Sequence, residues 1–396
     1  MKRVSTGIES LKSELARWKK AHKRKARVGI LCHPSSASRQ FEHLKTIADE
    51  HAELVCCFGP QHGIHGETQD NMIEWQDHHD EKGRPVYSLY GERRIPTPQS
   101  LQGLDIVICD LFDVGARYYT FIYTLYYMME VCGSLRIPVW ICDRPNPLGG
   151  NLVEGNILDT QYKSFVGLHP ITVCHGMTIG ELAQFFLQFC SKIPQIKILK
   201  MKGWNRSMFW KDTGLVWTLP SPNMPNDQAA LVYPGMCLLE GTSISEGRGT
   251  TRPFELIGAP FFDWQKIENV YHSEAKRLGL SPVVFHRQGF IPTFHKFKEQ
   301  VCRGALQFVP QARGFKPLRH MTLLLWIFRK LYSNQWQWKQ PPYEYEYHKL
   351  PIDILAGGPA LRETVDEQRP LKELFRSWER DEKDFHKIRR PYLLYK

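Results

Sequence analysis

The sequence predicts an α/β fold with a Rossmann-like, mostly parallel sheet, helices on both faces of the sheet, and a smaller α+β C-terminal domain. Four short apolar runs predict the strands, at residues 27–33, 54–58, 105–110 and 138–143. Each run is continuously apolar rather than alternating, as strands buried on both faces require. A helical pattern follows the first run and another precedes the fourth, which is the alternation typical of parallel strands joined by helices.

Polar, turn-forming residues follow every one of these four runs. The endings are His33-Pro34-Ser35-Ser36, Gly59-Pro60-Gln61-His62-Gly63, Asp110-Leu111-Phe112-Asp113-Val114-Gly115 and Asp143-Arg144-Pro145-Asn146-Pro147. In open α/β sheets, ligands bind at the carboxyl ends of the strands. Four such endings together predict an enzyme-like site at that edge, and the turn at residues 60–63 is its clearest part.

The length of the chain and a change in its sequence pattern indicate two domains. Its 396 residues suit one large or two medium domains. After Trp264 the pattern becomes helical and mixed, with aromatic clusters. We therefore predict a catalytic domain over residues 1–260 and an auxiliary domain over residues 261–396.

The net charge of +11 is concentrated at one end of the chain. Residues 1–28 hold ten Lys and Arg residues against two acids, which accounts for most of the excess. A nucleic-acid groove needs basic residues spread along a surface, so we expect no nucleic-acid partner. Ile8, Leu11, Leu15 and Trp18 recur at helical spacing, which predicts an amphipathic helix with a solvated basic face.

The cysteines and the length of the apolar runs indicate in which cellular compartment the protein is located. None of the apolar runs reaches the roughly 20 residues of a membrane-spanning helix, and no secretory signal pattern follows Lys2 and Arg3. Five of the ten cysteines lie in strand-like runs, where a free thiol behaves as a small hydrophobe, and no C-x-x-C pair suggests zinc. We expect a cytoplasmic protein without an integral membrane segment.

The turn after the second run offers the first candidate chemistry. His62 and His65 lie three residues apart, and with Asp70 they could hold a metal ion; His78, His79 and Asp80 are nearby. Gly63 and Gly66, however, imply a sharply turning backbone without a helical ligand face. A metal-dependent hydrolase is therefore kept only as an alternative, and we predict no metal or cofactor.

Charged residues also follow the third and fourth runs. Asp113 beside Arg117 and Tyr118 is either a loop-organising ion pair or a catalytic group, and both interpretations stay open. The prolines of the fourth ending hold Asp143, Arg144 and Asn146 in extended backbone, which suits contact with a ligand and also suits a rigid connector.

The segment at residues 239–253 is the richest polar block. Glu240 and Glu246 are candidate acids or bases, and Arg248 or Arg252 could bind an anionic group. No Gly-Lys-Ser/Thr follows, so it is not a phosphate-binding loop. The residues around Ser245 miss the nucleophile elbow, and no Gly-x-Gly-x-x-Gly follows the first run, which disfavours serine hydrolases and dinucleotide binding.

Taken together, these blocks resemble the NamZ-like exo-β-N-acetylmuramidases, a family formerly catalogued as a domain of unknown function. The matching motifs cover nearly the whole chain, at residues 7–9, 60–63, 85–91, 113–120, 143–150, 153–155, 164–167, 176–181, 220–225, 240–260 and 390–395. The resemblance implies an active site between a Rossmann-like domain and a smaller auxiliary one. It implies release of N-acetylmuramic acid from the non-reducing end of peptidoglycan fragments, without a cofactor.

The expected site follows from these motifs. The expected catalytic residues are Gln61, His62, Asp113 and Glu246. The expected substrate-binding residues are Arg117, Tyr118, Asp143, Arg144, Asn146, Glu154, Asn223, Glu240, Ser245, Arg248, Thr250 and Arg252. Either Arg248 or Arg144 would bind the lactyl carboxylate of muramic acid.

One residue departs from the family pattern. The usual turn reads Pro-Glu-His-Gly, and its Glu is the family's leading catalytic candidate, whereas this chain has Gln61. An amide neither donates nor takes a proton as a general acid or base, and glycoside hydrolysis normally needs two carboxyl groups. Asp113, Glu246, Glu240 and Glu67 are the candidate substitutes, and Gln61 could orient an N-acetyl group. The alternative is an altered or non-catalytic carbohydrate-binding member of the same fold.

Overall fold

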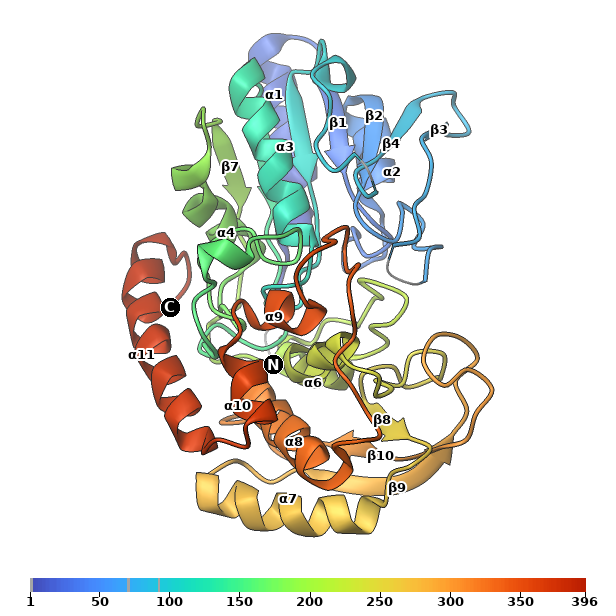
Figure 1. Cartoon of the computed structure of the whole chain (residues 1–396). Coiled ribbons are helices and arrows are strands. Elements are labelled where there is room, and N and C mark those ends of the chain that lie inside the picture. The colour runs from blue at the N-terminus through green and yellow to red at the C-terminus, as the bar shows by residue number, and fades with distance from the viewer. Residues whose placement is uncertain (1–2, 70–71, 92) are drawn as a thin grey trace.

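A seven-stranded sheet forms the first part of the protein in the computed structural model, which describes residues 3–69, 72–91 and 93–396 (Figure 1). The strand order is β3-β4-β2-β1-β5-β6-β7, and all neighbours are parallel except β3 and β4. The strands are β1 (Arg27–Leu31), β2 (Glu53–Gly59), β3 (His78–His79), β4 (Pro85–Ser88), β5 (Ile106–Cys109), β6 (Val139–Cys142) and β7 (Ile196–Leu199). The four predicted runs are β1, β2, β5 and β6, so the predicted mostly parallel sheet is confirmed.

Both faces of this sheet are covered by helices. On β5, Ile106 and Ile108 join the apolar cluster of α1 (Leu11–His22) and α2 (Leu44–His51). Val107 and Cys109 of the same strand join the cluster of α3 (Phe121–Leu135) and α4 (Ile179–Phe186) on the opposite face. Successive side chains of a strand point to opposite faces, which is why these runs had to be apolar throughout.

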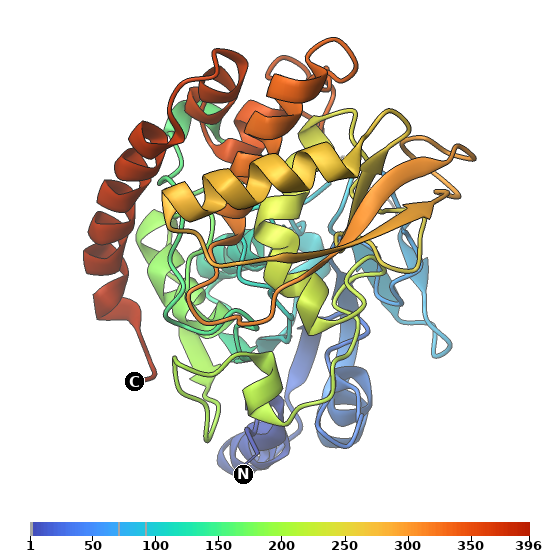
Figure 2. The ribbon, with the colours of Figure 1, turned by 90° about the horizontal axis from the view of Figure 1, so that it is seen from below.

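A smaller antiparallel sheet organises the second part (Figure 2). Its order is β8-β10-β9, from β8 (Leu256–Ala259), β9 (Val284–Phe290) and β10 (Cys302–Phe308). The remaining helices are α5 (Trp210–Thr213), α6 (Asp227–Met236), α7 (Trp264–Leu278), α8 (Pro317–Tyr332), α9 (Pro351–Ala356), α10 (Ala360–Asp366) and α11 (Leu371–Arg389). This is the smaller α+β part that the sequence predicts.

The predicted boundary near residue 260 falls directly after β8. That strand pairs with β10 of the smaller sheet, and α6 packs against α8. Residues from 227 onward therefore already contribute to the second part.

Two segments of the second part return to the first. After α11, which runs along the side of the molecule (Figure 1), Tyr395 donates a hydrogen bond to Asp143 at 2.5 Å. Between α8 and α9, the chain rises to the carboxyl ends of the large sheet (Figure 1). The second of these segments brings a loop of the second part to the predicted site edge.

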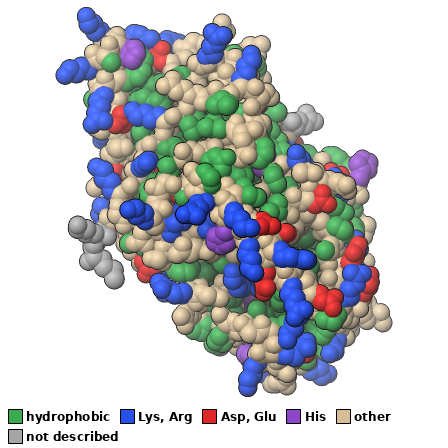
Figure 3. All heavy atoms as spheres, turned by 90° about the vertical axis from the view of Figure 1, so that its left-hand side faces the viewer, with side chains coloured by type: hydrophobic (Ala, Val, Ile, Leu, Met, Phe, Trp, Pro, Cys, Tyr) green, Lys and Arg blue, Asp and Glu red, His purple; other side chains and the backbone are tan. Residues whose placement is uncertain are grey.

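Part of the basic excess near the N-terminal end lies in ion pairs. Lys12 pairs with Glu42 at 2.6 Å and Arg24 with Asp105 at 2.6 Å. In Figure 3, acidic and basic side chains intermingle over the lower part of the face that carries α11. Within the described ranges, no helix is both long and apolar enough to cross a bilayer.

Candidate active site

A buried pocket lies where the carboxyl ends of the large sheet meet the second part. Gln61 and His62 line it from the end of β2, and Tyr119 and Thr120 line it from the segment before α3. Its other wall comes from the second part and includes Glu240, Arg248, Tyr343 and Glu344. We call it the carboxyl pocket, because two buried glutamates face it.

Gln61 has a fixed orientation in this pocket. Its Oε1 accepts a hydrogen bond from Thr120 Oγ1 at 2.7 Å. Its Nε2 donates to Tyr90 Oη at 3.1 Å and to Glu344 Oε1 at 3.4 Å. The amide therefore acts as a donor to a carboxyl group of the second part, a contact that a carboxylate at position 61 could not make.

Glu344 is a functional candidate that the sequence interpretation missed. It is 2% exposed, and Tyr90 Oη donates to both of its oxygens, at 3.2 and 3.1 Å. Burial, and then the charge of Glu240, raise the pKa of Glu344 to about 7. A carboxyl group with that pKa is partly protonated near neutral pH, which is the state that a general acid needs.

The turn that carries Glu344 is strained. Tyr343 and Glu346 exchange two backbone hydrogen bonds, of 3.0 and 2.9 Å, around Glu344 and Tyr345. Both central residues have positive φ, 46° and 64°, as a type I′ turn requires. Asn and Gly normally occupy such positions, and other residues there cost on the order of 1–3 kcal/mol each. Strain of this kind is typical of functional sites.

Contacts with the first part hold this turn in place. The Arg94 guanidinium lies over the rings of Phe165 and Tyr345, at 4.4 and 4.6 Å, and donates to the Glu344 carbonyl oxygen at 3.3 Å. Tyr345 Oη donates to Glu74 Oε1 at 2.7 Å. These contacts tie Glu344 to the loops that follow β2 and β4.

Glu240 is the second carboxyl group of the pocket. It lies in the 3₁₀ turn η5 (Cys237–Gly241) and is 4% exposed. Arg248 Nη2 donates to its Oε1 at 2.7 Å, and Tyr343 Oη donates to its Oε2 at 2.7 Å. Both oxygens are therefore held by side-chain donors, one of which is a guanidinium. The neighbouring Gly241 is required, because a Cβ there would lie 2.8 Å from the backbone nitrogen of Ile352.

Glu246 lies behind this pair. Lys296 Nζ donates to Glu246 Oε2 at 2.8 Å, and Arg248 Nε lies 3.8 Å from Oε1. Burial opposes its charge, yet Lys296, His295 and Arg248 hold the pKa of Glu246 below its ordinary value. Lys296 also donates to the carbonyl oxygen of Leu239, next to Glu240. Glu246 therefore supports Arg248 and Glu240 from outside the pocket lining.

Other expected residues form the pocket wall. His62, with φ 75°, donates through Nδ1 to the carbonyl oxygen of Thr68 at 2.7 Å. Asn223 Nδ2 donates to the carbonyl oxygen of Gln69 at 2.7 Å, and the Tyr118 hydroxyl donates to that of Pro234. Gln61, His62, Tyr118, Asn223, Glu240 and Arg248 are thus brought together around one pocket.

The structure places Asp113 and Arg117 elsewhere. Asp113 accepts from the Gly115 backbone and lies 3.3 Å from His175 Nε2. Arg117 is fully buried, and its guanidinium donates to four backbone carbonyl oxygens, those of Asn156, Ile171, Leu355 and Ala356. These contacts join the loops of the two parts of the chain.

Asp143, Asn146 and Glu154 also bond to backbone groups. Asp143 accepts from the Gly180 nitrogen at 2.8 Å, and burial raises its pKa to about 7. Asn146 donates to the carbonyl oxygen of Met177 at 3.0 Å. Glu154 accepts from Leu318 and Arg319 at the start of α8, both at 3.0 Å, where a carboxylate also complements the helix dipole. These three side chains therefore stabilise loops and helix ends.

Four further predicted residues and Glu67 lie outside the pocket lining. Ser245 Oγ accepts from the Gly247 nitrogen, and Thr250 Oγ1 donates to the Gly247 carbonyl oxygen. Arg252 pairs with Glu255 at 2.8 Å, and Arg144 pairs with buried Asp110. Glu67 is exposed. Their roles in substrate binding or catalysis stay predictions.

In the part of the chain that the structure describes, no cluster of donor side chains forms the alternative metal site. No three His, Cys, Asp or Glu side chains there are placed to hold a metal ion. The rings of His65 and His78 lie 6.5 Å apart between centroids. Asp70, the third expected ligand, lies outside the described residues.

Comparisons with known proteins cover the whole chain. The family models described as exo-beta-N-acetylmuramidase NamZ match residues 28–228 with the N-terminal model and residues 231–395 with the C-terminal model. The peptidoglycan beta-N-acetylmuramidase NamZ of Bacillus subtilis (strain 168) is 40% identical over 398 residues, which span 99% of this chain and 92% of that protein.

Two crystal structures of DUF1343 family proteins from Bacteroides fragilis NCTC 9343 share the fold. One superposes with a TM-score of 0.86 at 29% identity and covers 100% of this chain and 99% of the other. The second has a TM-score of 0.75 at 27% identity and covers 99% of each chain.

Proposed function

Since the chain belongs to the NamZ family of exo-β-N-acetylmuramidases, we propose that it is a glycoside hydrolase that releases N-acetylmuramic acid from the non-reducing ends of peptidoglycan fragments. One observation carries the proposal for this chain in particular. Although residue 61 is an amide, the carboxyl pocket still holds two buried carboxyl groups, Glu344 and Glu240. Glycosidases normally use such a pair.

In the proposed reaction, Glu344 is the general acid. It donates its proton to the glycosidic oxygen as the bond between that oxygen and the anomeric carbon breaks. Ionised Glu240, held by Arg248 and Tyr343, faces the developing positive charge on the sugar. Water supplies the hydroxyl group that replaces the leaving sugar, and its remaining proton restores the acid.

In this scheme, Gln61 positions groups without exchanging protons. Its Nε2 stays within hydrogen-bond reach of Glu344, while Thr120 fixes its Oε1. An amide in this place can also bond the N-acetyl group of the substrate.

Release of free N-acetylmuramic acid from a defined oligosaccharide tests the proposal. We expect the wild type to release the one N-acetylmuramic acid at the non-reducing end of such an oligosaccharide, as followed by mass spectrometry. Saccharide binding without any released sugar would instead favour the non-catalytic, carbohydrate-binding alternative that Gln61 suggests.

Replacing Arg248 is expected to weaken recognition of the muramyl substrate. Of the two arginines expected to bind the lactyl carboxylate, Arg248 lines the carboxyl pocket, whereas Arg144 lines another pocket. Loss of a charge-assisted bond to a carboxylate costs about 1.5–3 kcal/mol. Arg248→Leu should therefore raise KM for a chromogenic N-acetylmuraminide by at least about tenfold.

Two comparisons separate this effect from damage to Glu240. KM for the matching N-acetylglucosaminide, which lacks the lactyl group, should rise much less in Arg248→Leu. The control Arg277→Leu, an exposed arginine on α7 paired with Glu274 at 2.7 Å, should leave both KM values unchanged. An equal rise for both sugars in Arg248→Leu would rule out recognition of the lactyl group.

We further propose that the protein works in the cytoplasm on recycled cell-wall sugars. All ten cysteines are free thiols, nine of them buried, which suits a reducing compartment. Cell fractionation with an antibody tests this, and recovery of the protein outside the cytoplasmic fraction would contradict it.

A further inference from the structure

The amino ends of the parallel strands form one surface, at the end of the large sheet opposite to the carboxyl pocket. The strands β1, β5, β6 and β7 are neighbours, and residues 19–26, 102–105, 135–138 and 190–195 lead into them. Neighbouring strands lie about 4.8 Å apart, so these four segments lie side by side within roughly 15 Å. We call the surface that they form the amino edge.

Exposed basic side chains gather on the amino edge. Asp105 is the one acid in its four segments, and it pairs with Arg24 at 2.6 Å. In Figure 3, basic side chains with few acidic ones among them cover the top of the molecule, which is the end at which these strands begin in Figure 1. Within the described ranges, six exposed basic side chains of this edge have no acidic partner: Lys19, Lys20, Lys23, Lys25, Arg136 and Lys192.

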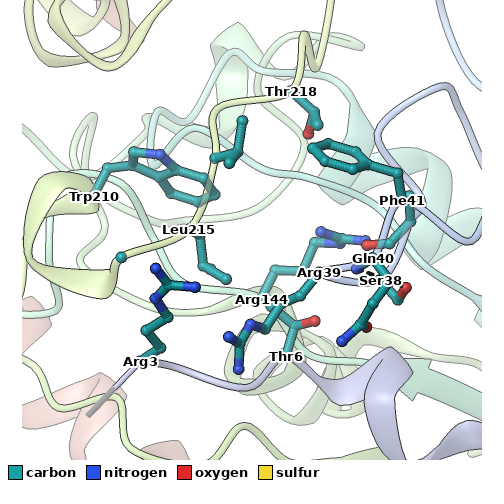
Figure 4. Close-up of a pocket in the computed structure, with 13 residues that line it drawn as sticks. Arg3, Thr6, Ser38, Arg39, Gln40, Phe41, Arg144, Trp210, Leu215 and Thr218 are labelled. Atoms are coloured by element: carbon teal, nitrogen blue, oxygen red, sulfur yellow. Dashed lines mark hydrogen bonds between the residues drawn. The ribbon is translucent and has the colours of Figure 1, made fainter. Parts of the chain in front are cut away.

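A second cluster of cations lies at the opposite, carboxyl edge and carries less net charge. In Figure 4, Arg3, Arg39 and Arg144 surround a pocket of about 190 Å³. Arg144 pairs there with buried Asp110 at 2.5 Å, so only the exposed Arg3 and Arg39 add positive charge. The larger excess of positive charge is therefore on the amino edge.

Two exposed apolar side chains project among the cations of the amino edge. Ile193 is 70% exposed and Leu135 is 38% exposed, and each is next in sequence to a basic residue, Lys192 and Arg136. The two segments touch, because a Cβ at Gly133 would lie 1.9 Å from the Lys192 carbonyl oxygen. Apolar and basic groups thus share one small surface.

An open apolar groove continues this surface. It holds about 430 Å³ between the 3₁₀ turn η2 (Gln99–Leu101), the segment that follows this turn and the end of α3. Its described lining residues are all uncharged, and Leu101, Leu104, Leu135 and Ile137 are the large apolar ones. The groove can take an apolar group of a partner whose charged groups meet the lysines.

This combination of groups favours a lipid bilayer over a polyanion in solution. A soluble polyanion needs only the cations. At a bilayer, Lys and Arg attract acidic headgroups while apolar side chains enter the boundary between headgroups and acyl chains.

We propose that the amino edge docks the protein on the surface of a bilayer that contains anionic lipids. Strands of four to seven residues separate this edge from the carboxyl edge, which is a distance of roughly 13–23 Å. The carboxyl pocket then faces away from the bilayer and stays open to saccharide fragments. Docking does not depend on cleavage of a glycan, so it can be tested apart from the proposed function.

Co-sedimentation with lipid vesicles tests the docking surface. We expect the wild type to bind vesicles of equal parts phosphatidylcholine and phosphatidylglycerol, and to be released by high salt, which screens exposed charges. Vesicles of phosphatidylcholine alone should not bind. Lys20→Glu/Lys23→Glu should bind the anionic vesicles at least about tenfold more weakly, because each basic residue near an anionic surface adds to the attraction.

The double variant Arg3→Glu/Arg39→Glu is the matched control, because it makes the same change in net charge at the opposite edge. It should bind the anionic vesicles like the wild type, and both double variants should keep the wild-type Tm. If Lys20→Glu/Lys23→Glu unfolds, Lys192→Glu repeats the test from another segment. Absence of binding by the wild type, equal binding by the amino-edge variant, or an equal loss in the control overturns the proposal.

Ile193→Ser separates a bilayer from a soluble polyanion. The variant keeps every charge but removes an apolar side chain that the bilayer would bury, so binding to the anionic vesicles should weaken at least about threefold. Inorganic polyphosphate, as the soluble polyanion, should bind Ile193→Ser and the wild type alike. Vesicle binding that is unchanged in Ile193→Ser would overturn the assignment to a bilayer and favour a polyanion in solution.

Discussion

Glu344→Gln is expected to lower kcat on a muramyl substrate by about 10²–10⁴-fold, with a much smaller change in KM. A positioned general acid contributes a factor of that size. The isosteric amide keeps the donors Tyr90 and Gln61 within reach but has no acidic proton to give.

The pH profile adds a second signature to this variant. With the pKa of Glu344 raised to about 7, the wild type should lose activity as the pH rises through about 7, because the acid form disappears. This fall in activity is the alkaline limb of the pH–rate profile. The residual activity of Glu344→Gln should lack it. Glu346→Gln is the matched control, because Glu346 lies on the same turn but is partly exposed beside Lys349. This variant should keep the wild-type rate and the alkaline limb of the pH–rate profile. Near-normal activity of Glu344→Gln would eliminate this residue as the acid.

Glu240→Gln should reduce kcat by about 10²-fold or more. The variant keeps the shape of the side chain and can still accept hydrogen bonds from Arg248 and Tyr343. It removes the negative charge that faces the positive charge on the sugar in the transition state, and such electrostatic stabilisation is commonly the largest catalytic term.

The alkaline limb distinguishes the role of Glu240 from that of Glu344. The charge of Glu240 helps to raise the pKa of Glu344. In Glu240→Gln the alkaline limb of the pH–rate profile should therefore move to lower pH. In Glu344→Gln, by contrast, this limb should be absent. Glu379→Gln, an exposed change on α11, should behave like the wild type. A Glu240→Gln enzyme with an unshifted limb would argue against electrostatic coupling of the two carboxyl groups.

The sequence could predict the sheet and its functional edge because both depend on local patterns. Continuous apolar runs marked β1, β2, β5 and β6, and the polar residues after β2 identified Gln61 and His62. Glu240 and Arg248 were found because their segment is rich in Gly and charged residues.

Glu344 could not be found in this way, because its contact with Gln61 spans 283 positions of the chain. The only local signal was its setting, Tyr343-Glu344-Tyr345 after two prolines, an acid between aromatic residues. Arg117 and Glu154 show the converse difficulty. Their motifs indicate importance, but only the structure shows that they bond to buried backbone groups.

The pH–rate profile of Gln61→Glu tests most directly whether Glu344, rather than residue 61, supplies the acid. The substitution adds a third carboxyl group to the pocket, at the place where the amide nitrogen now lies 3.4 Å from Glu344. Two neighbouring carboxyl groups oppose each other's ionisation, so we predict a limb moved to higher pH and no gain in the maximal rate over the wild type. A gain of about a hundredfold or more with the limb in place would show that Gln61 stands where the working acid belongs, and would contradict the assignment to Glu344.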